Sequence, residues 1–380
     1  MQTFDVAIIG GGVIGLSIAR SLALRGAGRI GIFDRTALGS EASFAAAGML
    51  APQAEADTDD HFFRFACRSR DLYHSFAEAL RAESDTDVEL DETGTLYLAF
   101  DEDDEEEIAK RHTWQSEAGL PVQRLSTEEA RSLEPCINAS VTGALRFPLD
   151  VQVENRRLLT ALATSVDRLG VKIISGTHVE SVRVNRDRLH GLETSSGPIS
   201  SPVAVIAAGA WTTLIRLSQN GLDSGSFPRV EPIRGQMLCF DAQPRVNLHV
   251  IYSPRGYIVP RRDGRLLVGS TSEQAGFAKN VTAAGINSMV TNALEISRAI
   301  GGLPLRESWA GLRPRASDGL PVIGPYGGID GVFCATGHYR NGILLAPITG
   351  ELIAEAIVNN STSTLIVPFS PNRFDTVSVS

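Results

Sequence analysis

The sequence lacks the features that mark several protein classes. Its 380 residues include only four cysteines and no Cys-x-x-Cys pair, so neither a disulfide framework nor a zinc site is indicated. No apolar run reaches 18 residues, which predicts no membrane span, and acidic Asp5 comes too early for a secretory signal. The formal net charge of −9 argues against a nucleic-acid-binding surface. We therefore expect a cytoplasmic protein with reduced thiols that binds no metal and no nucleic acid.

Glycine, by contrast, is abundant. Thirty-six glycines exceed the usual share of about 7%, which indicates several close approaches of the backbone to other groups, as nucleotide sites require. The chain of 380 residues is also longer than one typical domain of roughly 150 residues, so two domains are expected.

The N-terminal stretch FDVAIIGGGVIGLSIARSLALRG has the pattern of a dinucleotide-binding unit. Its first residues are typical of a buried parallel strand, and the residues after the glycines have helical spacing. In such a unit Gly10 permits a tight turn, Gly12 lets backbone N–H groups approach a pyrophosphate, and Gly15 lets the helix pack close to the strand. The next strand, RIGIFD, ends in Asp34, whose carboxylate can accept a hydrogen bond from a ribose hydroxyl. The motif alone does not distinguish FAD from NAD.

The chain after Asp34 favours FAD. The small-residue stretch SFAAAGMLAPQ and an amphipathic helix with Phe62 and Leu80 on its apolar face interrupt the expected alternation of strands and helices. A helix at 158–169, a hairpin formed by HVESVRV and LHGLETSSG, and a buried strand at 202–211 follow much later. A nucleotide-binding unit interrupted in this way suits a flavoprotein that binds FAD along its full length.

Near the C-terminus, FCATGHYRNGILLAPITGELIAEAI predicts a parallel strand at 332–336, a turn that contains Gly337 and Gly342, and a helix at 343–358. Such a turn places the helix N-terminus outside the carboxyl end of the sheet, where open α/β sheets bind ligands. The positive end of that helix can stabilise negative charge on a reduced flavin.

Six stretches between residue 5 and about residue 357 together resemble the D-amino-acid oxidase superfamily of FAD-dependent oxidoreductases, and within it the glycine oxidase type linked to thiamine biosynthesis. They are VAIIGGGVIGLSIA, FAAAGMLAPQ, VIAAGAW, GYIVPRRDGRLLVGST, WAGLRPRASDGLPVIG and ATGHYRNGILLAPITGELIAE. The resemblance implies a mixed α/β fold in which a Rossmann-like FAD-binding domain is interleaved with a largely antiparallel β-sheet substrate domain. The FAD-binding domain would comprise 1–85, 145–225 and 310–365, the substrate domain 86–144 and 226–309, and a tail would follow at 366–380 that looks loosely held after Pro371.

The resemblance also implies which residues bind FAD non-covalently, since no cysteine aligns with an attachment point for the flavin. These residues are Gly10, Gly12, Val13, Ile14, Gly15, Asp34, Arg35, Ala42, Ser43, Ala47, Gly48, Met49, Val179, Gly209, His338, Tyr339, Arg340, Asn341, Gly342, Ile343 and Leu344. For the small-residue stretch AAAGML, Ala45–Leu50, plain helix packing is the alternative interpretation.

For the substrate, the resemblance implies Arg313, Tyr257 and Arg340. A planar guanidinium makes two parallel hydrogen bonds to a carboxylate, so Arg313 in WAGLRP would hold the α-carboxylate of an amino acid. The Tyr257 hydroxyl would lie near that carboxylate, and Arg340 would face the substrate. The alternatives are a structural arginine before Pro314, a tyrosine at the rim of a sheet and a surface arginine; Arg315 is a weaker rival to Arg313.

Two charged features are less closely tied to the chemistry. Arg255 stands where glycine oxidases have a histidine, two residues before the tyrosine. It could widen the preference toward a larger or acidic amine at the mouth of the site, or it could point to solvent. The acidic run at 101–107 predicts the charged start of a surface helix.

The implied reaction is FAD-dependent oxidative deamination of glycine or another small amine with an α-carboxylate. A hydride would pass from Cα to flavin N5, dioxygen would reoxidise the flavin to give hydrogen peroxide, and the imine would hydrolyse to ammonia and a keto acid, glyoxylate in the case of glycine. The alternatives are a D-amino-acid or proline dehydrogenase with a non-oxygen electron acceptor, an enzyme with covalently attached flavin, and a flavin subunit of a larger complex. A homo-oligomer is possible, and the sequence indicates no stoichiometry.

Overall fold

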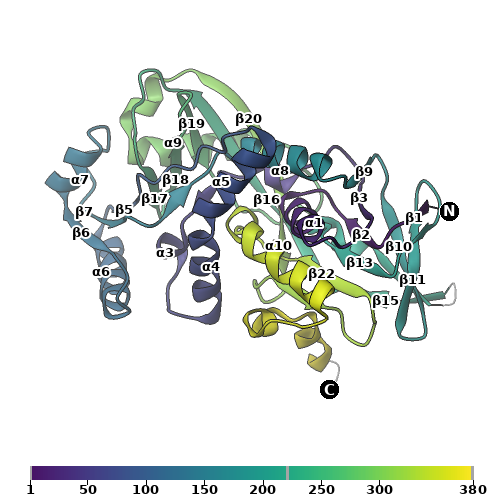
Figure 1. Ribbon diagram of the computed structural model, residues 1–380. Coiled ribbons are helices and arrows are strands. Elements are labelled where there is room, and N and C mark those ends of the chain that lie inside the picture. The colour runs from purple at the N-terminus through teal and green to yellow at the C-terminus, as the bar shows by residue number, and fades with distance from the viewer. Residues whose placement is uncertain (1, 220–221, 378–380) are drawn as a thin grey trace.

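The computed structural model describes residues 2–219 and 222–377 (Figure 1). A central six-stranded sheet has the order β21-β22-β13-β2-β3-β9. Its neighbouring strands run parallel, except that β21 and β22 are antiparallel. The strands are β2 (Val6–Ile9), β3 (Ile30–Asp34), β9 (Lys172–Ser175), β13 (Val203–Ile206), β21 (Val322–Pro325) and β22 (Val332–Thr336).

Both faces of this parallel sheet are covered, as its continuous apolar strands predict. Val6 and Ile8 point to one face and pack with three helices, whereas Ala7 and Ile9 point to the other face and pack against a second sheet. The helices are α1 (Val13–Leu24), α8 (Asn155–Arg168) and α10 (Gly342–Asn359). The second sheet has the order β1-β12-β11-β10-β14-β15 and comprises β1 (Gln2–Thr3), β10 (Val179–Asn185), β11 (Arg188–Thr194), β12 (Ile199–Ser200), β14 (Arg216–Gln219) and β15 (Leu222–Ser226).

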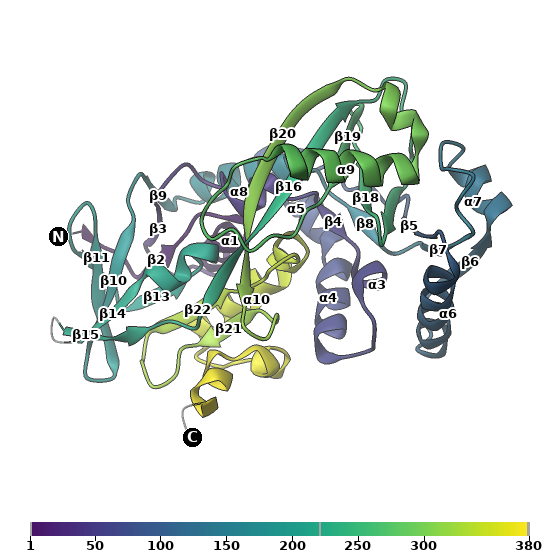
Figure 2. The ribbon, with the colours of Figure 1, turned by 180° about the vertical axis from the view of Figure 1, so that it is seen from behind.

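A third, eight-stranded sheet forms the other half of the molecule (Figure 2). It has the order β20-β16-β19-β18-β17-β5-β7-β6 and is antiparallel except between β17 and β5. Helix α9 (Ala283–Ile296) covers one of its faces. Its two longest strands, β16 and β20, reach into the parallel-sheet half. The strands are β5 (Thr95–Ala99), β6 (Gln123–Ser126), β7 (Gly143–Phe147), β16 (Val230–Asp241), β17 (Val250–Ser253), β18 (Gly256–Pro260), β19 (Arg265–Gly269) and β20 (Leu305–Ala316).

Shorter elements connect these sheets. A two-stranded sheet of β4 (Met49–Leu50) and β8 (Val151–Gln152) lies between the two halves. The remaining α-helices are α2 (Ala42–Ala45), α3 (Pro52–Glu55), α4 (His61–Asp71), α5 (Tyr73–Ser84), α6 (Glu102–Glu117) and α7 (Thr127–Leu133). The 3₁₀ helices are η1 (Gly209–Leu214), η2 (Arg298–Gly302), η3 (Thr364–Phe369) and η4 (Pro371–Val377).

Helix α10 contains a proline in its interior, and neighbouring helices compensate for it. Pro347 has no N–H with which to reach the carbonyl of Ile343 four residues earlier. The Tyr73 hydroxyl donates a hydrogen bond to that carbonyl instead. One residue further, the Ser69 hydroxyl donates to the Leu344 carbonyl at 2.6 Å. The N-terminal turns of α10 are therefore fixed by α4 and α5.

Helix α10 is also long and apolar enough to cross a membrane. Two-thirds of its length is buried inside the fold, and it packs on α1 and α4. Its apolar composition therefore belongs to the protein core.

The architecture confirms the expected mixed α/β fold with two interleaved parts. The strand predicted at 332–336 is β22, and the predicted hairpin is formed by β10 and β11. The third sheet is largely antiparallel, as expected for the substrate side. The borders expected at residues 145 and 310 fall inside strands β7 and β20 of this sheet.

The C-terminal residues pack against the rest of the molecule as far as they are described. Ile366 and Phe369 are buried, because their spacing places both on the inner side of η3, and Phe369 contacts the ring of Phe65. Arg373 donates to Asp318 Oδ2 at 2.7 Å. The expectation of a loosely held chain after Pro371 is therefore wrong at Arg373, and residues 378–380 of the expected tail lie outside the described residues.

Candidate functional site

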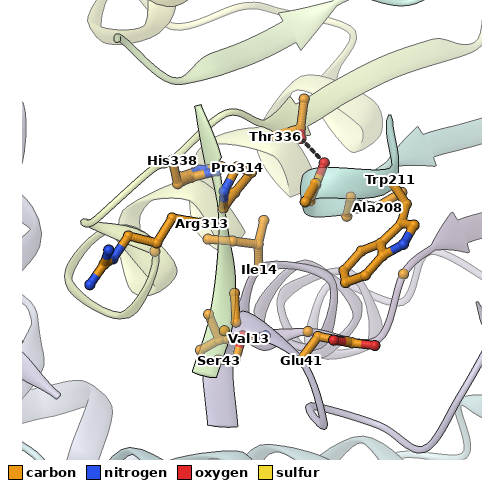
Figure 3. A pocket seen from close by; sticks show the side chains of 18 of the residues that line it. Val13, Ile14, Glu41, Ser43, Ala208, Trp211, Arg313, Pro314, Thr336 and His338 are labelled. Atoms are coloured by element: carbon orange, nitrogen blue, oxygen red, sulfur yellow. Dashed lines mark hydrogen bonds between the residues drawn. The ribbon is translucent and has the colours of Figure 1, made fainter. Parts of the chain in front are cut away.

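A cavity of about 780 Å³ lies where the carboxyl ends of β2, β13 and β22 meet the third sheet (Figure 3). Its volume falls within the range of roughly 300–1,000 Å³ that is typical of ligand sites. All the predicted cofactor residues line it except Gly15 and Leu344, and Arg313 and Tyr257 line it as well. Residues from distant parts of the chain thus meet in one place.

The two exceptions lie behind the cavity wall. A Cβ atom on Gly15 would overlap the carbonyl oxygen of Gly10, so Gly15 lets α1 pack closely on the loop after β2. The Leu344 side chain is buried in the core. At the loop itself, Gly10 has φ of +107°, and a side chain there would overlap the Ala207 carbonyl. This turn therefore requires glycine at position 10.

Side chains fix the backbone at the start of α1. Asp34 accepts hydrogen bonds from the Gly11 N–H at 2.7 Å and from the Thr36 N–H at 2.8 Å, one at each carboxylate oxygen. Ser43 Oγ accepts from the Val13 N–H at 3.1 Å, which leaves its hydroxyl hydrogen as a donor beside the helix N-terminus. Asp34 thus holds the loop, and the ribose contact predicted for it has to share these two oxygens.

The segment that contains Ala47 and Gly48 is held from behind. The buried Arg261 donates to the Ala47 carbonyl at 2.7 Å and to the Val153 carbonyl at 3.0 Å. Burial lowers the pKa of this guanidinium to about 10. Gly48 has φ of +73°, and a side chain there would overlap the Val153 carbonyl. Since α2 ends at Ala45, the residues after it form a cavity wall and not a packed helix, contrary to the alternative interpretation.

The N-terminus of α10 faces the same cavity. Asn341, Gly342 and Ile343 line it, and the first intrahelical bond runs from the Leu345 N–H to the Asn341 carbonyl at 2.8 Å. The N–H groups that precede this bond have no acceptor inside the helix, and they form its positive end. An anionic group of a ligand would be stabilised here.

His338 precedes this helix and is buried at 3% exposure. Burial lowers the pKa of its imidazole to about 3, and Nε2 lies 3.2 Å from Thr349 Oγ1. The ring is therefore neutral at physiological pH and packs against the helix. The contact with the cofactor that is predicted for His338 would therefore be made by its backbone.

Trp211 and Glu41 lie at another end of the cavity (Figure 3), and Arg35 contacts both of them. The Arg35 guanidinium lies 3.9 Å from the centre of a Trp211 ring and donates to Glu41 at 2.9 Å. Glu41 also accepts from Lys279 Nζ at 2.6 Å, which connects this end to the loop after β19. The wall here is polar and partly exposed, as suits the nucleotide end of a ligand.

Arg313 projects from β20 on the side of the cavity away from Trp211 (Figure 3). Its guanidinium lies over Gly235, where any side chain would collide with it. It donates to the Thr271 carbonyl at 3.0 Å and to Ser270 Oγ at 2.6 Å. Among the described residues no carboxylate lies within ion-pair distance of it. Neutral acceptors thus orient a cation whose charge remains available for an anionic ligand.

Arg340 is in a different electrostatic state. One of its terminal nitrogens donates to the Tyr252 hydroxyl at 2.9 Å and lies 3.5 Å from Glu55 Oε1. The Glu55 carboxylate raises the pKa of Arg340 above its usual value. Its side chain is 37% exposed. Arg340 therefore lies in the cavity wall and carries a counterion that the sequence did not indicate, and its contact with the substrate remains a prediction.

A row of aromatic side chains crosses the cavity-facing side of the third sheet. Tyr97, Tyr252 and Tyr257 are direct cross-strand neighbours on β5, β17 and β18, and their rings stack at 5.6 and 6.4 Å. The Tyr257 hydroxyl lies 3.1 Å from Met237 Sδ. The ring of Tyr257 lies over Gly269, whose missing side chain provides the space. The expected contact between this hydroxyl and a substrate carboxylate remains a prediction.

Arg255 does not reach the cavity. It donates to Asp101 at 2.9 Å and to Glu295 at 3.0 Å, and lies 3.8 Å from Asp104. The interpretation of Arg255 as a cation at the mouth of the site is therefore wrong, because carboxylates of α6 and α9 hold it on the other side of the sheet. The acidic run at 101–107 does begin a helix, α6, as predicted, with Asp101 as its N-cap.

Glu55, Met237 and Arg261 are the main parts of the site that sequence reasoning missed. Glu55 follows directly after the stretch AAAGMLAPQA, so proximity in sequence could have indicated it. Met237 could have been found from the alternation of side chains along PIRGQML. Residues two apart on a strand point to the same face, so Met237 shares the face of Ile233, which is the cross-strand partner of Arg313. Nothing in the sequence distinguishes Arg261 from its neighbour Arg262, and only its burial reveals its role.

The residues of this cavity fit a flavin dinucleotide. The glycine turn and the Ser43 hydroxyl at α1 suit a diphosphate, and the α10 N-terminus suits a second, electron-rich group. Side chains at positions 10 and 48 would fill part of the cradle, and glycine keeps it open. Among the described residues that line the cavity there is no cysteine to which a flavin could be attached.

Comparison with known proteins also indicates an FAD-binding protein. A family model described as FAD dependent oxidoreductase matches residues 5–356. The chain is 36% identical to a glycine oxidase of Geobacillus kaustophilus over 97% of both chains, and the crystal structure of a glycine oxidase from that species superposes with a TM-score of 0.92, covering 98% of this chain and 99% of that one. It is 35% identical to a bifunctional ThiO/ThiG protein of Synechocystis over 98% of this chain and 54% of that one. An iminodiacetate oxidase from Chelativorans is 28% identical with a TM-score of 0.84 and coverage of 96% and 98%.

Proposed function

Since the chain belongs to the FAD-dependent oxidoreductase family, we propose that it oxidises glycine or another small amine bearing an α-carboxylate, with dioxygen as electron acceptor. The products from glycine would be glyoxylate, ammonia and hydrogen peroxide. One observation carries the proposal: an arginine with no ion-pair partner among the described carboxylates lies in the same cavity as a glycine turn typical of dinucleotide sites. The relatives whose names include glycine oxidase and ThiO support the choice of glycine and a link to thiamine biosynthesis.

The residues of the chain divide the work between two ends of the cavity. The start of α1, with Ser43, would hold the diphosphate of FAD, and residues 338–343 would hold its ring system. FAD supplies the two-electron oxidation of the substrate when it is bound.

Arg313 would bind the substrate carboxylate through two parallel hydrogen bonds. Because Ser270 and the Thr271 carbonyl already fix the guanidinium, little side-chain freedom is lost when the substrate binds, and the orientation of Cα is set in advance. The Tyr257 ring and Met237 close the substrate end against water on the side of the third sheet. Exclusion of water strengthens the arginine–carboxylate attraction.

A panel of amines tests the proposal. Purified protein loaded with FAD is mixed in air with glycine, sarcosine, D-alanine or D-proline, and peroxide release and oxygen consumption are recorded. We expect equal amounts of peroxide formed and oxygen consumed with at least one of these amines. Reduction of a dye without peroxide would instead favour the dehydrogenase alternative, and turnover by the purified chain excludes an obligatory partner. A cytoplasmic location and a homo-oligomeric state remain predictions.

A further inference from the structure

The substrate end of the cavity contains two guanidinium groups with different surroundings. Arg313 has only neutral acceptors within hydrogen-bond distance among the described residues. Arg340 lies 3.5 Å from the Glu55 carboxylate, so its charge is largely compensated. The two arginines and the glutamate together carry one net positive charge. This end of the cavity is therefore matched to a ligand with one negative charge.

A series of contacts connects the two arginines. Arg313 donates to Ser270 Oγ at 2.6 Å, and Ser270 follows the residue over which the Tyr257 ring lies. The Tyr257 ring stacks on Tyr252 at 6.4 Å, and the Tyr252 hydroxyl accepts from Arg340. The two arginines are therefore the two ends of one series of contacts that passes through the tyrosine pair. A ligand held at Arg313 that extends along the tyrosines would meet Arg340 and its counterion.

Glu55 is held in place by the fold. It is the last residue of the short helix α3, whose preceding N–H groups at Gln53 and Ala54 donate to the buried Asp150 at 3.2 and 2.8 Å. Asp150 is completely buried and Ala54 is also buried. The Glu55 side chain itself is only 21% exposed. Because the backbone before it is anchored on this buried carboxylate, Glu55 can leave the cavity only by rotation of its side chain away from Arg340.

We propose that Glu55 restricts the substrate to amines with a single carboxylate group. The inference rests on the proposed function, because it assumes that Arg313 binds the α-carboxylate. A second carboxylate on the same ligand would have to displace Glu55 from Arg340, or it would lie next to the Glu55 carboxylate without a cation of its own. Either arrangement costs binding free energy. Amines with small neutral substituents, such as glycine and sarcosine, do not meet this cost. Glu55 thus selects against amines such as iminodiacetate.

Binding of unreactive carboxylates to the FAD-loaded protein tests this selection without turnover. Acetate carries one carboxylate and malonate two, and binding of each is followed by the change in the flavin absorption spectrum. The variants are Glu55→Gln, which removes the charge and keeps the shape, and Glu55→Asp, which keeps the charge. Glu106→Gln is the control for net charge, because Glu106 is exposed on α6 and lies outside the cavity.

We expect wild type, Glu55→Asp and Glu106→Gln to bind acetate more tightly than malonate. In Glu55→Gln the ratio of the two dissociation constants should shift toward malonate by about tenfold, equivalent to about 1.4 kcal/mol. With active enzyme, the ratio of kcat/KM for iminodiacetate to that for glycine should rise by a similar factor. Tighter binding of malonate than of acetate to wild type, or an unchanged ratio in Glu55→Gln, would overturn the proposal. Failure of wild type to oxidise any amine would overturn the proposed function instead, and the two carboxylates could still be compared.

Discussion

At the scale of single residues, the character of the site depends on which arginine has a counterion. The sequence identified Arg313 and Arg340 from their motifs, and both line the cavity. Their different surroundings could not be predicted, because Glu55 lies 285 positions before Arg340 in the sequence and reaches it only through the packing of α3. For the same reason the sequence left the orientation of Arg255 open: its three carboxylate neighbours come from the start of α6 and from α9, both distant in sequence.

Replacing Arg313 with alanine should separate catalysis from cofactor binding. Since the guanidinium contacts Ser270 and the Thr271 carbonyl and no cofactor-binding loop, we expect kcat/KM for the preferred amine to fall by about a hundredfold or more. The FAD content per chain, measured by absorbance after heat release, should remain close to that of wild type.

Arg306→Ala is the matched control for that experiment. Arg306 lies on the same strand, is exposed, and pairs only with Asp241 at 3.1 Å among the described carboxylates. Its replacement should leave both kcat/KM and FAD content unchanged. Parallel loss of activity and FAD in Arg313→Ala would show that Arg313 is a structural arginine, as the alternative interpretation holds.

At the scale of elements, the strand–turn–helix unit from β22 to α10 shows what local sequence can predict. The apolar run before Gly337 and the helical spacing after Gly342 located both elements to within a residue. The sequence also showed that Pro347 comes early in the helix. It could not show which group would satisfy the carbonyl that the proline leaves unpaired, because the donor, Tyr73, is 270 residues away.

Tyr73→Phe should therefore destabilise the protein. The buried Ile343 carbonyl would lose its donor and remain unpaired in the core, which costs about 1–3 kcal/mol in the free energy of unfolding. Chemical unfolding followed by circular dichroism measures this change.

Pro347→Ala provides the internal check by a double-mutant cycle. An alanine at this position supplies the N–H that can reach the Ile343 carbonyl within the helix, so it should offset much of the loss caused by Tyr73→Phe. If the two substitutions were strictly additive, the hydrogen bond from Tyr73 would not be a replacement for the helical one.

At the scale of the whole molecule, the cavity is bounded by all three large sheets. It is lined by Ile9 of the parallel sheet, Val179 of the second sheet and Tyr257 of the third. The interleaved chain path explains why pattern reasoning found the fold class but placed segment borders at 145 and 310, which fall inside strands β7 and β20. Periodicity along a strand reports which face is buried, and it does not report the sheet to which the strand belongs.

Cofactor binding should consequently stabilise the entire chain and not one half of it. At a free FAD concentration one hundred times the dissociation constant, the gain is about 2.7 kcal/mol. Thermal unfolding of cofactor-depleted protein should show a single midpoint that rises with the logarithm of added FAD. NAD serves as the control dinucleotide and should have little effect. Two separate transitions, of which FAD moves only one, would contradict this expectation.

The unbroken strands β16 and β20 have a mechanical consequence. Each passes from one half to the other as paired backbone, with continuous register from Val230 opposite Ala316 to Cys239 opposite Glu307. A hinge motion between the two halves would require flexible backbone where they join, and two long paired strands do not bend easily. Substrates must then enter through movements of side chains and loops around a rigid frame. After proteolytic cleavage in exposed loops, the fragments should accordingly stay associated, and neither half should be released by itself.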